Sequence, residues 1–116
     1  MNTNFNILNK MKKTNLYIEN LIKNFPKKEV ILKNNLEQSM FKAIELIFTY
    51  NIQTTFRIKE KYIKDFIIEI SMLNYYIEFS YERKFISKHQ RDVVGRYLIE
   101  IRKMIYGVIQ NDKTKI

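Results

Sequence analysis

Residues 86–110, ISKHQRDVVGRYLIEIRKMIYGVIQ, have the pattern of an amphipathic helix. Ser87 and Gln90 have the spacing of a capping box, in which each side chain bonds a backbone N–H that the start of a helix leaves free. After this cap, apolar residues recur at helical spacing and form a single face: Val94, Tyr97, Leu98, Ile101, Met104, Ile105 and Val108. We therefore expect a helix over about residues 88–110, followed by a frayed polar tail at 111–116.

The side of this helix that faces away from the apolar residues is basic. Arg91 and Arg102 are eleven residues apart and project in almost the same direction, while Arg96 and Lys103, seven apart, form a second row. Lys88 falls between the two rows, and two more lysines follow the proline near residue 26. We expect these side chains to contact the phosphates of a nucleic acid. The predicted nucleic-acid-binding residues are Lys88, Arg91, Arg96, Arg102, Lys103, Lys27 and Lys28.

The charge of the whole chain agrees with a basic surface. The formal net charge is +9, and both halves contribute: residues 1–56 hold 8 Lys and Arg against 4 Asp and Glu, and residues 57–116 hold 13 against 8. The basicity therefore belongs to the folded part and is not a charged tail. A folded domain with this charge indicates an anionic partner, most often nucleic acid. The alternative is an ordinary solvated surface in a lysine-rich protein.

The rest of the chain fits long helices joined by short connections. Only 2 Gly and 1 Pro occur in 116 residues, which argues against a sandwich or barrel with many turns. The clearest break is Asn24-Phe25-Pro26-Lys27, because a residue before proline is pushed out of helical geometry. We expect one all-α domain, an antiparallel up-down four-helix bundle with helices over about residues 4–25, 28–51, 56–84 and 88–110. No signal peptide and no long apolar run is visible, so we expect a cytoplasmic protein without membrane contact.

The third predicted helix carries two apolar stripes. The first is the expected core face: Ile63, Phe66, Ile67, Ile70, Leu73, Ile77 and Tyr81. The second consists of Ile68, Met72, Tyr75 and Phe79, which recur at i, i+4, i+7 and i+11. A helix in a monomeric bundle needs only one such face, so we expect the second stripe to be an oligomer interface with another copy of the chain. The alternative is that this helix lies deeply between its own neighbours.

Three polar or small positions carry further expectations. Asn15 interrupts the apolar seam of the first helix, and either it is buried with a partner and fixes the register or it is half-exposed at the seam edge; we favour the half-exposed position. Thr54 or Thr55 can cap the third helix. Gly95 and Gly107 each weaken the fourth helix relative to Ala, and we expect close approach of a neighbouring helix to explain them.

The sequence contains no recognisable catalytic or metal-binding constellation. There is no Cys and only one His, which excludes thiolate and multi-histidine metal sites. His89 has Ile86 three residues before it where a di-metal bundle would need Glu, and no Gly-rich phosphate loop is present. We therefore expect a protein that is not an enzyme and that needs no cofactor.

Two stretches carry a resemblance to a known family. They are Asn24-Phe25-Pro26-Lys27, followed by a long amphipathic helix, and residues 98–109, LIEIRKMIYGVI. From about residue 16 to residue 109 the chain resembles small four-helix-bundle proteins of bacteria. This group includes the accessory variability determinant of diversity-generating retroelements and the proteins encoded in intervening sequences of 23S rRNA genes.

The resemblance implies a four-helix bundle that assembles as a homopentameric barrel with a basic surface. It further implies a non-catalytic, RNA-binding accessory subunit that partners a reverse transcriptase and binds its template RNA and cDNA during mutagenic reverse transcription. The alternative, from the rRNA-intervening-sequence branch, is a structural or protein-interaction bundle whose positive charge is incidental.

Overall fold

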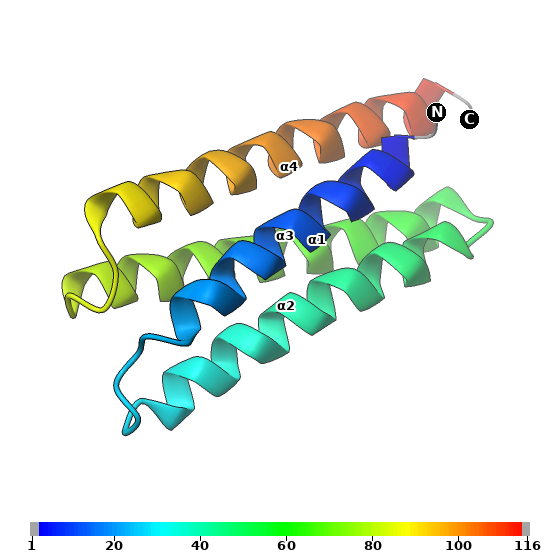
Figure 1. Cartoon of the computed structure of the whole chain (residues 1–116). Helices are drawn as coiled ribbons and strands as arrows, with labels where there is room; N and C mark the ends of the chain where they lie inside the picture. The colour runs from blue at the N-terminus through cyan, green and yellow to red at the C-terminus, as the bar shows by residue number, and fades with distance from the viewer. Residues whose placement is uncertain (1–2, 115–116) are drawn as a thin grey trace.

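A computed structural model describes residues 3–114 of the chain, with side chains described for residues 6–111. The described part is entirely helical, with no strand, which confirms the predicted all-α class with four helices (Figure 1). The helices are α1 (Thr3–Ile22), α2 (Val30–Asn51), α3 (Phe56–Glu82) and α4 (Lys88–Thr114).

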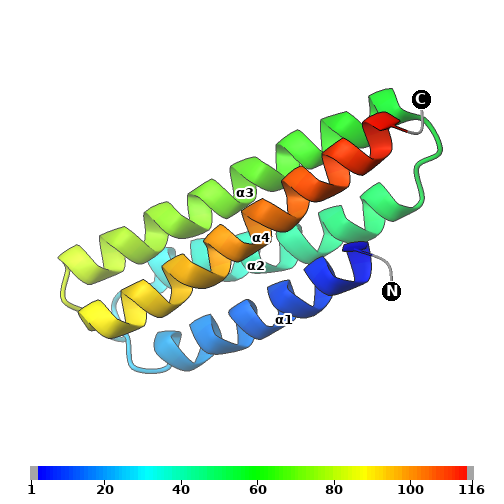
Figure 2. The same ribbon diagram turned by 90° about the horizontal axis from the view of Figure 1, so that it is seen from above.

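The four helices run antiparallel to their neighbours and form a closed ring (Figure 2). α1 packs against α2 and α4, and α3 packs against the same two helices, so that within the described residues the diagonal pairs do not approach closely. The bundle measures 49 × 23 × 20 Å. The α1–α2 loop and the α3–α4 turn lie at one end, and the α2–α3 loop lies at the other (Figure 1).

The helix boundaries differ from the predicted ones by a few residues. α1 ends at Ile22 and α2 begins only at Val30, because the N–H of Glu29 bonds the carbonyl of Pro26 in an intervening turn. α4 continues to Thr114, so the residues 111–114 that we expected to fray are helical, and residues 115–116 lie outside the described part. Thr55 takes the N-cap position of α3, but its side chain makes no capping hydrogen bond, contrary to the prediction.

The turn between α3 and α4 has the hydrogen bonds of a Schellman motif. The N–H of Phe85 donates to the carbonyl of Ser80 over 2.9 Å, and the N–H of Lys84 donates to the carbonyl of Tyr81 over 2.9 Å. Lys84 has φ of 65°, a left-handed conformation that glycine usually occupies at this position. Phe85 then packs against Phe25 with ring centroids 5.5 Å apart, which ties this turn to the α1–α2 loop.

The core is built from the faces that the periodicity predicts. In α3 the first stripe is buried except at its edges, where Ile67 and Tyr81 are half-exposed. In α4 the face from Val94 to Val108 is likewise buried, with Tyr97 and Met104 half-exposed. Val93, which the pattern did not include, is also buried. The predicted division of each helix into a packed side and a solvent side is therefore confirmed.

Asn15 is buried, and the favoured half-exposed position is wrong. Its side chain is 9% exposed, and its Nδ2 donates a hydrogen bond to the backbone carbonyl of Met40 on α2 over 3.2 Å. Its Oδ1 is buried without a partner in the described residues. This contact joins α1 to α2 at one point along their length, as a buried amide that sets helix register would do.

The two glycines of α4 do not mark a close helix approach. A Cβ built on Gly95 or on Gly107 would have no heavy atom within 4 Å. The expectation of tight packing at these positions is therefore wrong, because both glycines lie on the part of the α4 surface that no other helix of the chain covers.

Candidate nucleic-acid interface

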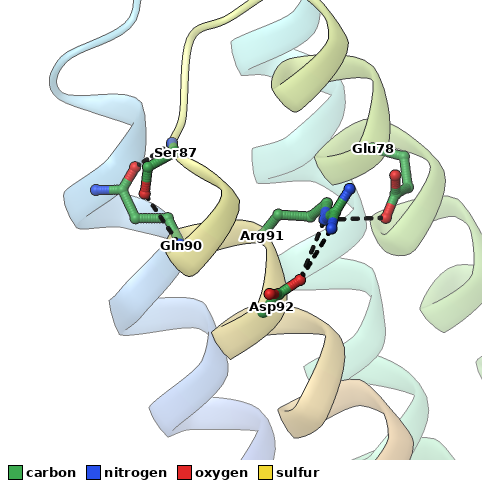
Figure 3. Close-up of polar contacts among 5 residues, drawn as sticks. All are labelled: Glu78, Ser87, Gln90, Arg91 and Asp92. Carbon is green, nitrogen blue, oxygen red and sulfur yellow. Dashed lines mark hydrogen bonds and ion pairs between the residues drawn. The ribbon is translucent and has the colours of Figure 1, made fainter.

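The predicted capping box sets the start of α4. The N–H of Ser87 donates to Oε1 of Gln90 over 2.8 Å, and the N–H of Gln90 donates to Oγ of Ser87 over 3.1 Å (Figure 3). These reciprocal bonds satisfy two N–H groups at the helix start. They also fix where the helix begins, and thereby the direction in which each basic side chain of α4 projects.

Arg91 points toward α3 rather than into solution (Figure 3). Its guanidinium lies 4.2 Å from the ring centroid of Tyr81, 3.9 Å from the carboxylate of Glu78 and 3.1 Å from that of Asp92. The Arg91 side chain is 24% exposed. A cation already bound by two carboxylates and an aromatic face has less capacity left for a phosphate.

Arg102 lies in the same α3–α4 seam. Its Nη2 donates to Oγ of Ser71 on α3 over 3.0 Å, and that hydroxyl in turn donates to the carbonyl of Ile67. The first predicted row, Arg91 and Arg102, is therefore brought together along α3, with both side chains engaged inside the molecule.

The second predicted row projects into solution. Arg96, Lys103 and Lys88 are exposed, and within the described residues none of them forms an ion pair or a side-chain hydrogen bond. Lys27 and Lys28 are exposed in the α1–α2 loop. That loop lies at the same end of the bundle as the start of α4, so these two lysines and Lys88 share one end of the molecule (Figure 1).

The structure adds two lysines from α1 to the basic surface. The Nζ atoms of Lys10 and Lys13 lie 4.7 Å and 5.4 Å from the ring centroid of Tyr97 on α4. Tyr17 meets the same ring edge-on, with centroids 6.1 Å apart and planes at 84°. The sequence places lysines on the polar side of the first helix, but it carries no signal that joins them to the fourth.

A single carboxylate lies among these cations. Glu100 of α4 forms an ion pair with Lys10 across the α1–α4 seam. The hydrogen bond from Lys10 lowers the pKa of Glu100, and the charges of Lys10, Lys13 and Arg96 lower it further, against a partial desolvation that acts in the opposite direction. The direction of this shift shows that the seam has a positive potential.

The second stripe of α3 is uncovered in the single chain. Ile68 is 57% exposed and Tyr75 is 58% exposed, while Met72 and Phe79 are half-buried. The alternative in which α3 lies deeply between its own neighbours is therefore wrong for Ile68 and Tyr75. Beside the stripe runs a groove of about 410 Å³ between α2 and α3, whose lining includes Met72.

Further apolar side chains are exposed on α1 and α2. Leu16 is 61% exposed, Phe41 is 65% exposed and Phe48 is 55% exposed. Phe41 and Phe48 are seven residues apart and therefore project from the same side of α2. Isolated apolar residues are common on protein surfaces, but two exposed phenylalanines on one helix face indicate a contact surface.

Two classes of feature do not occur in the described residues. No group of three or more His, Cys, Asp and Glu side chains is arranged to hold a metal ion. None of the four helices, over the residues described, combines the length and the apolar character that crossing a membrane requires. Comparison with protein-family models, with curated proteins and with solved structures finds no match to this chain.

Proposed function

We propose that the chain is a non-catalytic, nucleic-acid-binding accessory subunit of a reverse transcriptase from a diversity-generating retroelement. It acts in the bacterial cytoplasm, where it binds the template RNA and the cDNA. The observation that carries the proposal is the set of exposed cations on α4, Lys88, Arg96 and Lys103, which no carboxylate of the described chain neutralises. Cations held on a rigid helix are suited to contact phosphates, which position a nucleic acid without reading its sequence.

The proposed protein acts as an oligomer. The exposed stripe of Ile68, Met72, Tyr75 and Phe79 supports self-association, because four apolar side chains in line along a helix favour packing against another helix. The pentameric copy number follows from the family resemblance.

A second candidate function is a protein-interaction bundle whose charge is incidental. The exposed phenylalanines Phe41 and Phe48 favour it, because they offer an apolar surface far from the basic residues of α4. In this case the partner is another protein and the +9 charge serves solubility.

The two candidates are separated by isolating the protein from its own cells, sequencing the bound RNA and identifying the bound proteins. Recovery of a reverse transcriptase with one structured template RNA supports the retroelement function. Recovery of neither, from a protein that remains a stable oligomer, contradicts it and favours the interaction bundle. Binding to purified RNA at several salt concentrations gives a second measurement, because phosphate contacts make the affinity fall steeply with salt.

A further inference from the structure

The basic residues of α4 border two different seams, and the two seams differ in charge. In the α3–α4 seam, Arg91 and Arg102 are matched by Glu78 and Asp92, and Ser71 takes up a donor of Arg102. Little positive charge is left there for a ligand. A nucleic acid that approached this side would have to displace these contacts before it gained phosphate contacts of its own.

The α1–α4 seam has the opposite balance. Lys10 and Lys13 come from α1, and Arg96 and Lys103 come from α4, while Glu100 is the carboxylate between them. Arg96, Glu100 and Lys103 share one face of α4 because they stand at i, i+4 and i+7. Arg96 and Lys103 are separated by about 10.5 Å along the helix axis, at 1.5 Å per residue.

The lysines of this seam are held in place. The ring of Tyr97 lies beneath both ammonium groups, and Tyr17 supports that ring from the side. The Lys10 side chain is only 19% exposed. Cations that are positioned before a ligand arrives lose less side-chain entropy on binding than lysines that move freely in water.

We propose that the nucleic-acid backbone lies along the α1–α4 seam, where Lys10, Lys13, Arg96 and Lys103 contact its phosphates and Glu100 weakens binding by competing for Lys10. This inference rests on the proposed nucleic-acid-binding function and names the surface that performs it. Glu100 stands where an anion is stabilised by three cations, so a phosphate and this carboxylate compete for the same positive charge.

The proposal predicts a gain of affinity from one neutral substitution. Glu100→Gln removes the competing charge and releases Lys10. The matched control is Glu78→Gln, which removes the partner of Arg91 on the other seam. Both changes raise the net charge by one, and the two side chains are similarly exposed, at 49% for Glu100 and 46% for Glu78. A general effect of net charge would therefore appear equally in both variants.

The probe is a fluorescein-labelled single-stranded RNA of about 20 nucleotides, long enough to cover a typical single-strand site. Fluorescence anisotropy gives the dissociation constant at several salt concentrations. We expect Glu100→Gln to bind about two- to fivefold more tightly than the wild type, the range that surface charge pairs support. Glu78→Gln should bind as the wild type does, and Lys13→Ala with Lys103→Ala should lower the salt slope by roughly 2, about 1 per lost phosphate contact.

Each outcome decides between the seam and the function. Tighter binding by Glu100→Gln alone supports the seam. If Glu78→Gln gains as much or more, or if neither variant differs from the wild type, the α1–α4 assignment is wrong, while salt-dependent binding by the wild type leaves the proposed function standing. If the wild-type protein does not bind the RNA at all, both the seam and the proposed function are overturned. Circular dichroism melting of each variant checks that the bundle is intact.

Discussion

Replacing the two glycines of α4 by alanine should stabilise the protein. Glycine inside a helix is about 0.8–1.0 kcal/mol less favourable than alanine, because the unfolded glycine backbone loses more freedom on folding. At Gly95 and Gly107 the added methyl group meets no heavy atom within 4 Å, so no clash reduces the gain. The two sites are twelve residues apart, about 18 Å along the axis, so their effects should add.

The expected size follows from these terms. The double variant should unfold with a free energy higher by about 1.6–2 kcal/mol. For a chain of 116 residues, an unfolding entropy of about 2.1 cal/mol/K per residue converts each kcal/mol into about 4 °C, so Tm should rise by about 7 °C. Urea titration gives the free energy and a thermal melt followed by circular dichroism gives Tm, for each single variant and for the double.

A loss of stability at either site would refute this reasoning. It would mean that a surface outside the single chain packs against the glycine, because within the chain the space is open. Repeating the melt over a range of protein concentrations identifies that case, since a penalty that arises between copies weakens as the oligomer dissociates.

Three further predictions concern the core, the turn and the proposed interface. Asn15→Leu should stabilise the bundle by about 1–2 kcal/mol, because it removes a buried oxygen without a partner at the cost of one hydrogen bond to Met40; a lower free energy of unfolding in urea would contradict this. Lys84→Gly should raise stability by about 0.5–1 kcal/mol, since glycine adopts φ of 65° without the strain of a side chain, and an unchanged Tm would show that the turn carries no such strain. Met72→Glu with Phe79→Glu should lower the oligomeric state measured by light scattering, and an unchanged particle mass would exclude this stripe as the interface.

The sequence predicts local features well because their causes are local. The capping box of Ser87 and Gln90 depends on residues three apart, and it forms as predicted. Helical periodicity separates the buried face of α3 from the exposed stripe for the same reason. Errors at the helix ends are small because Pro26 marks the break, but it does not tell how many residues the turn takes before α2 begins.

Features that depend on a second helix could not be predicted in this way. The burial of Asn15 requires knowing that the Met40 carbonyl faces it from α2. The periodicity places Arg91 away from the apolar face, but its long side chain bends back to Tyr81 and Glu78 of a helix whose position the sequence does not give. The same limit hides the contact of Lys10 with Glu100, which joins two helices at opposite ends of the chain.

The order of helices around the bundle connects the two proposed surfaces. The stripe of Ile68 and Tyr75 lies on the outer side of α3, and the α1–α4 seam lies on α3's diagonal neighbour and one of its flanking helices, so copies that associate through α3 leave their seams accessible. Several seams on one particle can then bind one RNA strand, and each added seam acts at the high local concentration set by the assembly. The Met72→Glu and Phe79→Glu variant should therefore bind a long RNA more weakly, with a smaller salt slope, although neither residue belongs to the seam. Adding Glu100→Gln to this variant should still tighten its binding, because each seam binds by its own contacts, and a failure to do so would show that the RNA site forms only between copies.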